Sequence, residues 1–190
     1  MTKQIIFGIA LLVTFAVFFY TISHIIGFFK LTKPAPPIRN LGKRFGLMMK
    51  VAFGQTKIFR RPIIGFFHAM VFWGFCIIIF GSIEMVFDGL TGGEKFFKFL
   101  GPVHDIIMAL GDIFALLVLI SVVIFLIRRL FMNIKRFTGI EMKKKSHIDA
   151  IISLSLILVL MISLLAMNTG YVNYTALEGR NQYGVYPVSE

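Results

Sequence analysis

The sequence predicts an all-α integral membrane protein, a bundle of four transmembrane helices with one further amphipathic helix at the membrane surface. The first observation is composition, because 57% of the 190 residues are hydrophobic and only 15% are charged, which is too apolar for a soluble domain. The second is a set of four apolar runs of about 20 residues, the length that crosses a hydrocarbon core of about 30 Å. The third is a basic segment after the first run whose apolar residues recur at helical spacing.

The transmembrane helices are expected at about residues 5–29, 62–87, 103–127 and 148–167. They make up a helical domain over residues 1–170, which a polar, tyrosine-rich outer tail follows over 171–190. The first run is too long for a signal-peptide core and lacks a small-x-small cleavage site, so we expect it to be retained. A single cysteine, Cys76, cannot bind an iron–sulfur cluster alone, so no such cluster is expected in this chain.

The segment between the first two runs predicts a helix that lies in the cytoplasmic interface. Its apolar and basic residues alternate at helical spacing: Leu41, Phe45, Met48, Val51 and Ala52 against Lys43, Arg44 and Lys50. An apolar stripe beside basic residues is typical of a helix on a lipid surface. A merely solvated basic linker would not need that stripe.

The net charge of +11 is concentrated in two loops. Residues 30–61 hold nine basic residues and no acidic residue, and residues 128–146 hold seven basic residues and one glutamate. The positive-inside rule therefore places both loops in the cytoplasm and both termini outside. Basic chains also bind nucleic acid, but no basic surface module is left once the bases at helix ends are accounted for, so no nucleic-acid partner is expected.

All four histidines lie in or beside the apolar runs, where a polar ring needs a partner. On the predicted topology, His24, His68 and His147 lie toward the cytoplasm. His104 alone lies toward the outside. The three histidines on the cytoplasmic side are therefore considered together as candidate ligands, and His104 is considered separately.

His68 is the first candidate ligand, because it lies about two turns inside the apolar part of RRPIIGFFHAMVFWGF, residues 60–75. The functional interpretation is ligation of a haem iron, with Gly65 leaving room for the porphyrin and Phe72 shielding its edge. The alternative is a histidine that hydrogen-bonds across helices. His24 is at comparable depth and is a possible second ligand, whereas His147 fits an interfacial, partly hydrated position better.

Four titratable residues near the outer side are candidates for proton transfer to or from a quinone. Glu84 ends the second apolar run, and His104, Asp105 and Asp112 follow in the third. Asp105 and Asp112 are seven residues apart and so share a helix face. An unpaired carboxylate at the depth of Asp112 would be costly, so a packing role satisfied by a neighbouring serine or backbone group is an equal alternative.

Three segments together resemble a known family: FGQTKIFRRPIIGFFHAMVFWGF, LIRRLFMNIKRF and MNTGYV. The chain resembles the N-terminal membrane domain of bacterial membrane-bound iron–sulfur-binding oxidoreductases. That domain is related to the cytochrome b-type gamma subunit of respiratory nitrate reductase and to the membrane subunits of heterodisulfide reductases. The likeness is strongest from Lys43 to Lys135.

The resemblance implies a haem b that moves electrons between membrane quinone and a cytoplasmic iron–sulfur protein, in the bacterial cytoplasmic (inner) membrane. It carries over His68 as one haem ligand. In such proteins the opposing ligand commonly comes from a fifth helix and the clusters from a following cysteine-rich domain, and this sequence has neither. The nitrate-reductase-type second histidine is also missing near Ile58. The chain is therefore expected to be completed by another chain or a missing C-terminal domain, to use His24 or His147 as second ligand, or to have lost the haem.

The function predicted from the sequence is that of a membrane electron-transfer subunit or domain, not a complete enzyme alone, in contact with lipid, quinone and a cytoplasmic iron–sulfur partner. The alternative is a cofactor-free anchor or assembly subunit whose histidines only tie helices together. A small transporter is a more distant alternative, because no broken helix or inverted repeat marks a substrate site at the membrane midplane.

Overall fold

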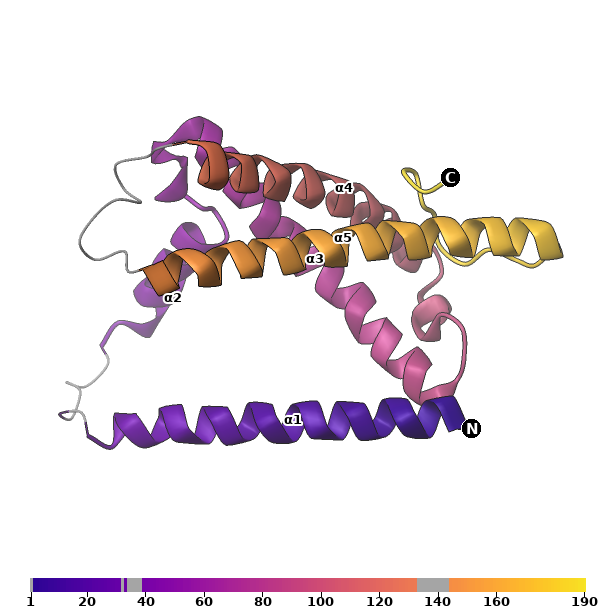
Figure 1. The fold of residues 1–190 in the computed structure, drawn as a ribbon, viewed down its shortest axis with the longest axis horizontal. Coiled ribbons are helices and arrows are strands. Elements are labelled where there is room, and N and C mark those ends of the chain that lie inside the picture. Colours follow the sequence, from indigo (N-terminus) through magenta and orange to yellow (C-terminus); the bar gives the residue numbers. More distant parts are fainter. Residues whose placement is uncertain (1, 32, 34–38, 133–143) are drawn as a thin grey trace.

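The computed structural model describes residues 2–31, 33, 39–132 and 144–190, with the backbone alone for 144–146. The predicted all-α fold is confirmed, since the chain over these residues forms helices and no strands (Figure 1). The elements in order are α1 (Thr2–Phe29), α2 (Leu41–Ala52), the 3-10 helix η1 (Ile58–Arg60), α3 (Pro62–Thr91), the 3-10 helix η2 (Phe96–Leu100), α4 (Pro102–Phe131) and α5 (Lys144–Glu178). Helices α1, α3, α4 and α5 are long and apolar enough to cross a membrane, which fits a multi-pass membrane protein.

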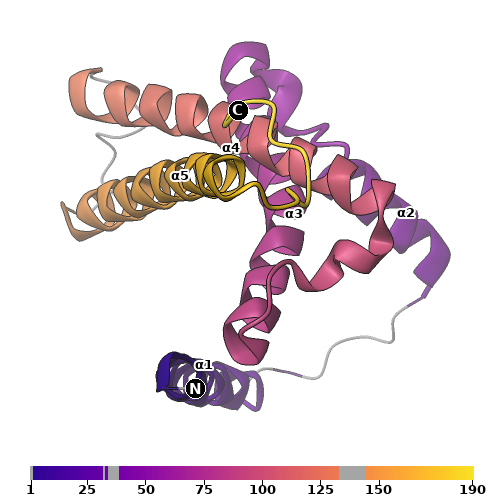
Figure 2. The same ribbon diagram turned by 90° about the vertical axis from the view of Figure 1, so that its right-hand side faces the viewer.

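Both termini lie at one end of the molecule, together with the turn between α3 and α4 (Figures 1 and 2). Helix α2 and the start of α5 lie at the opposite end. We call these the outer end and the cytoplasmic end, after the predicted topology. The proline-rich segment 34–38 and most of the second basic loop, residues 133–143, lie outside the described residues.

Helix α4 is central to the bundle, because it packs against both α3 and α5. Helix α4 approaches α3 closely at Gly74, where Val118 Cγ2 leaves no room for an added Cβ. Ala115 and Val122 on α4 are fully buried. Large apolar side chains elsewhere on these helices are exposed, as expected where the surrounding solvent is lipid.

Helix α1 stands apart from the other helices over most of its length, and none of its residues is buried (Figure 2). It contacts α3 at the outer end, where Gln4 Nε2 donates to the Thr91 carbonyl at 3.0 Å. There the Phe7 ring also lies against Gly89, 2.6 Å from where a Cβ would stand. The cytoplasmic half of α1 therefore takes no part in the packing of α3.

The predicted helix in the first basic loop is confirmed as α2, and its place at the membrane surface stays a prediction. The loop after it packs on α3. Trp73 Nε1 donates to the Phe53 carbonyl at 2.9 Å, and the Ile58 carbonyl lies 2.4 Å from where a Cβ on Gly65 would stand. Gly65 is thus needed for the close approach of η1.

The apolar runs predicted from the sequence each lie within one long helix, but the helices extend further. The largest difference is at the end of the chain. Helix α5 continues to Glu178, well into the segment expected to be a polar tail. Residues 179–190, which we call the return segment, then fold back onto α4 (Figure 1).

Candidate functional site

A cavity of about 310 Å³ lies between α3, α4 and α5 toward the outer end. Its wall is mainly apolar, formed by isoleucine, leucine, methionine and glycine residues of the three helices. The polar side chains that line it include Glu84, Asp88, Lys95, Asp112, Asn168 and Tyr186. An apolar cavity with a few converging polar groups is typical of a small-molecule site.

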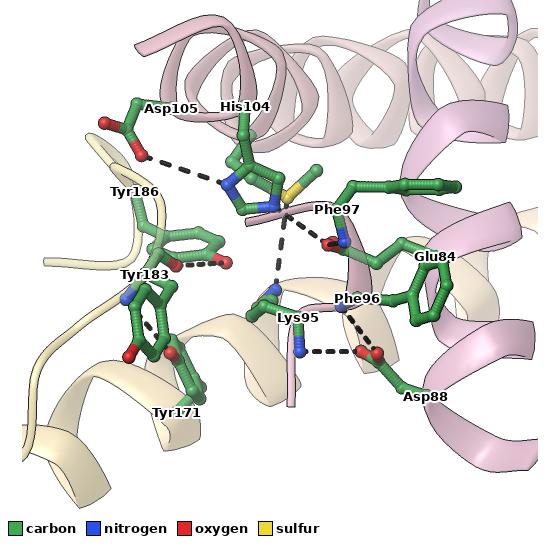
Figure 3. Close-up of polar contacts among 11 residues, drawn as sticks. Glu84, Asp88, Lys95, Phe96, Phe97, His104, Asp105, Tyr171, Tyr183 and Tyr186 are labelled. Atoms are coloured by element: carbon green, nitrogen blue, oxygen red, sulfur yellow. Dashed lines mark hydrogen bonds and ion pairs between the residues drawn. The ribbon is translucent and has the colours of Figure 1, made fainter. Parts of the chain in front are cut away.

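Glu84 on α3 and His104 on α4 form a buried pair beside this cavity (Figure 3). Their side chains are 2% and 1% exposed, and His104 Nε2 lies 2.9 Å from Glu84 Oε1. The Phe97 amide also donates to Oε1, at 3.0 Å. Both contacts of this carboxyl group within the described part of the chain are made by Oε1 and none by Oε2. One oxygen of this carboxyl group is therefore left for a ligand in the cavity.

His104 also connects the buried pair to the surface. Its Nδ1 lies 3.9 Å from Asp105 Oδ1, and the Asp105 side chain is 48% exposed (Figure 3). A proton accepted by Glu84 can pass to His104 Nε2 across the 2.9 Å contact, whereas its release from Nδ1 to Asp105 needs a bridging water, because 3.9 Å exceeds hydrogen-bonding distance. The structure brings together these three predicted residues, Glu84, His104 and Asp105.

Asp88 fixes the turn that follows α3. Its two carboxylate oxygens accept the amides of Lys95 and Phe96, at 3.1 and 2.8 Å. These bonds hold Lys95 in the left-handed conformation, with φ of 52°. They direct the chain back over the outer end of the bundle before η2 and α4 begin.

Lys95, in the turn after α3, is a charged residue of the cavity wall. Its Nζ lies 5.1 Å and 5.2 Å from the ring centres of Tyr171 and Tyr186, and 4.0 Å from Met108 Sδ (Figure 3). Aromatic faces attract an ammonium group. Burial lowers the pKa of Lys95, and the carboxylate of Glu84, with that of Asp88, partly opposes this shift.

Asp112, about two turns further along α4 than His104 and Asp105, is held differently. Its side chain is 1% exposed and accepts four hydrogen bonds. Asn168 Nδ2 donates to Oδ1 at 2.9 Å, and Ser189 Oγ to Oδ1 at 2.7 Å. The amides of Val188 and Ser189 donate to Oδ2, at 2.8 and 3.0 Å. These contacts agree with the packing role expected as the alternative for Asp112, with Asn168 on α5 and the other three donors in the return segment.

The return segment is fitted closely over α4 and α5. Gly184 has φ of 89° and lies so near Met108 that an added Cβ would be 2.9 Å from its Cγ. The Tyr183 amide donates to the Tyr171 hydroxyl at 3.1 Å. Tyr186 is 1% exposed, and burial raises its pKa. The docking of this segment on α4 was missed from the sequence because Val188 and Ser189 lie 76 and 77 positions from Asp112.

His68 at the cytoplasmic end is exposed on the surface of α3. Its ring lies 6.4 Å from the ring of Phe125 on α4, and within the described residues no second imidazole is in contact with it. Phe72 lies against Phe53, at 5.8 Å between ring centres. Gly65 faces η1. The small and aromatic residues near His68 thus pack against the loop after α2.

The other two histidines proposed as ligands lie on other helices. His24 is exposed on α1 and contacts Tyr20, and α1 meets α3 only at its outer end. His147 lies at the start of α5, where its carbonyl accepts a bond from Arg129 Nη2 at 3.4 Å. The described residues of this chain therefore supply one candidate haem ligand, His68, without a second beside it. They also contain no group of three histidine, cysteine or carboxylate side chains that could hold a metal ion.

Comparison with curated proteins finds the probable iron-sulfur-binding oxidoreductase FadF of Bacillus subtilis (strain 168), which is 29% identical over 105 residues. The match covers 55% of this chain and 15% of that protein, so the chain corresponds to a small part of its relative's length. No family model matches the chain, and no solved structure matches it significantly. The similarity is to a protein named as an iron-sulfur-binding oxidoreductase, and it agrees with the resemblance stated from the sequence over part of the chain.

Proposed function

We propose that this chain is the membrane electron-transfer component of a bacterial iron–sulfur oxidoreductase and exchanges electrons with a quinone in the cavity between α3, α4 and α5. The observation that carries the proposal is the buried Glu84–His104 pair beside an apolar cavity, with Asp105 leading from it to the surface. The similarity to an iron–sulfur-binding oxidoreductase supports the redox context.

The cavity suits a quinone because a quinone ring is apolar on both faces and polar only at its two oxygens. The apolar side chains of the wall can contact the two faces of the quinone ring. The polar residues of the wall, among them Glu84 and Lys95, can contact its oxygens. Glu84 Oε2 can accept a proton, and the Lys95 ammonium can donate a hydrogen bond.

Oxidation of a quinol releases two electrons and two protons. In the proposal, the electrons go to one-electron centres of an iron–sulfur partner, and the protons leave one after the other through Glu84, His104 and Asp105. Each transfer returns the relay to its starting protonation state before the next. Quinone reduction uses the same groups in the opposite direction.

The partner is proposed to dock at the cytoplasmic end. Lys43, Arg44 and Lys50 of α2 lie there, with Arg60 and Arg61 before α3. Such a cluster attracts acidic protein surfaces and anionic lipid headgroups. We place the complex in the bacterial cytoplasmic membrane, with the iron–sulfur centres on a separate protein or on a further domain of a longer chain.

Haem b belongs to this proposal in a restricted form. His68 is exposed and has no second imidazole beside it in the described residues, so this chain alone does not form a two-histidine site. We propose that a partner polypeptide supplies the other ligand. The same observation favours the alternative of a cofactor-free anchor. A reduced-minus-oxidised absorption spectrum of the complex, in wild type and His68→Ala, separates the two, since a haem band that the substitution abolishes excludes the anchor.

Quinone binding is tested by photolabelling of the full chain in detergent micelles with a photoreactive short-chain quinone. Gly111 lines the cavity and has no atom within 4 Å of an added Cβ, so Gly111→Leu fills space that the ligand would use. Gly27 on α1 is equally open and far from the cavity, which makes Gly27→Leu the matched control. The proposal expects labelled peptides from α3, α4 or α5, lost in Gly111→Leu and kept in Gly27→Leu. Equal labelling of both variants contradicts it.

A further inference from the structure

We propose that residues 183–190 of the return segment hold Tyr186 in the wall of the ligand cavity, and that Asp112 is the positioning residue that docks this segment. The identity of the ligand rests on the proposed function, whereas the docking of the segment does not. Asp112 then acts through Tyr186, which lines the cavity, and not as a carrier of protons.

The bonds at Asp112 support an anchoring role. Both of its oxygens are occupied, by two backbone amides, one serine hydroxyl and one asparagine amide. None of these four donors titrates near neutral pH. A carboxylate with both oxygens so bonded has no partner to which it can pass a proton. Three of the four bonds come from Val188 and Ser189, so loss of the carboxylate releases the end of the segment first.

Tyr186 lies only two residues before Val188, and its position depends on that anchor. Its side chain is 1% exposed, its ring lies 5.8 Å from that of Tyr171, and Lys95 Nζ lies over it. Gly184 against Met108 sets the other end of the segment. Because the segment is held at both ends, Tyr186 stays in the cavity wall. If the bonds to Asp112 are lost, the Tyr186 ring moves out of the wall and the cavity opens on this side.

Docking is tested first, by hydrogen exchange of the Val188 and Ser189 amides in the full chain. These amides bond to Asp112 Oδ2. Both are expected to be protected in wild type. In Asp112→Ala the Val188 amide is expected to exchange freely, whereas the Ser189 amide keeps a second acceptor, the Tyr186 carbonyl at 3.1 Å, and is expected to lose only part of its protection. In the control Asp149→Ala, at the cytoplasmic start of α5, both are expected to stay protected. Continued protection of the Val188 amide in Asp112→Ala overturns the inference, and this readout needs no quinone.

The link to the cavity is tested by a double-mutant cycle on the dissociation constant of menadione, a small quinone. The variants are Asp112→Ala, replacement of residues 183–190 by a glycine–serine sequence of equal length, and both together. Each alone is expected to weaken binding about ten-fold, the loss for one well-packed aromatic contact, and the double variant no further. Tyr186→Ala, which leaves the anchor intact, is expected to weaken binding similarly.

Two results would overturn the inference. Unchanged binding in Asp112→Ala would show that the anchor does not shape the cavity. A further loss in the double variant would show that Asp112 acts on the ligand without the segment. If wild-type protein does not bind menadione, the proposed function fails, and the exchange experiment still decides whether Asp112 docks the segment.

Discussion

The side chains of Glu84 and Asp112 are 2% and 1% exposed, and both line the same cavity. Their hydrogen-bond partners, however, differ. Glu84 makes both of its contacts through Oε1, one of them with a histidine, which can take up and release a proton. Asp112 has both oxygens bonded to groups that cannot. Burial alone therefore does not identify a proton carrier. The chemistry of the partners separates the transfer group from the structural one.

The largest expected effect is on turnover, through Glu84. Glu84→Gln keeps the shape and one acceptor oxygen but removes the proton-accepting group, so quinol oxidation by the complex is expected to slow about 10²-fold. The assay follows quinol-dependent reduction of the iron–sulfur partner at saturating quinol. Glu94→Gln, on an exposed residue of the same outer turn, is the matched control and is expected to keep the wild-type rate. Equal rates in both variants would contradict the role given to Glu84.

Substitution of Asp112 is expected to affect the stability of the fold more than the rate of quinol oxidation. Asp112→Ala removes the acceptor of four hydrogen bonds, and of the four donors only the Ser189 amide keeps another acceptor, the Tyr186 carbonyl. We expect a loss of about 2–3 kcal/mol in the free energy of unfolding. Denaturant titration in detergent micelles measures this loss. Glu84→Gln is expected to change the unfolding free energy by less than Asp112→Ala. A reversed order would remove the distinction between the two carboxyl groups.

A smaller effect is expected at the other end of the segment that Asp112 holds. Gly184→Ala places a Cβ close to Met108 at a φ that disfavours alanine, so we expect a loss of about 1–2 kcal/mol. Gly170→Ala is the control, because Gly170 lies within α5 with open space around it. There alanine is expected to be neutral or slightly stabilising. Equal stability of the two variants would show that the segment is not fitted against α4.

The smallest effect is a pH dependence from Lys95. Its pKa in the folded protein is lowered below 10.5, so between the two values the unfolded chain binds more protons. Stability is therefore expected to rise with pH in the window below 10.5. The measurement stops near pH 10, because the raised pKa of Tyr186 makes stability fall at higher pH. In Lys95→Met this rise of stability with pH is expected to disappear. If the rise persists in the variant, another titrating group causes it.

The sequence predicted the helices well because apolar length and charge asymmetry are local signals. Runs of apolar residues marked α1, α3, α4 and α5, and the spacing of Leu41 and Phe45 marked α2. The extension of α5 to Glu178 was missed, because the apolar run ends at Met167 and polar residues beyond it gave no sign that the helix continues.

The candidate site was predicted only in part, for a physical reason. Glu84, His104 and Asp105 stood out because titratable residues in apolar helices are costly and need partners. Which partner each one finds depends on tertiary contacts, so the bonds of Asp112 to Ser189 were not visible in the sequence. The predicted pairing of His24 with His68 assumed that α1 packs along α3, and α1 instead meets α3 only near Gln4 and Phe7.

The most direct test of the account is an infrared difference spectrum recorded as menaquinol bound to the chain is oxidised at an electrode. If Glu84 takes the proton, a change in a carboxyl C=O stretching band accompanies oxidation in wild type. The account predicts that this change disappears in Glu84→Gln and persists in Asp112→Asn. A band that survives Glu84→Gln, or that is lost in Asp112→Asn, would contradict it.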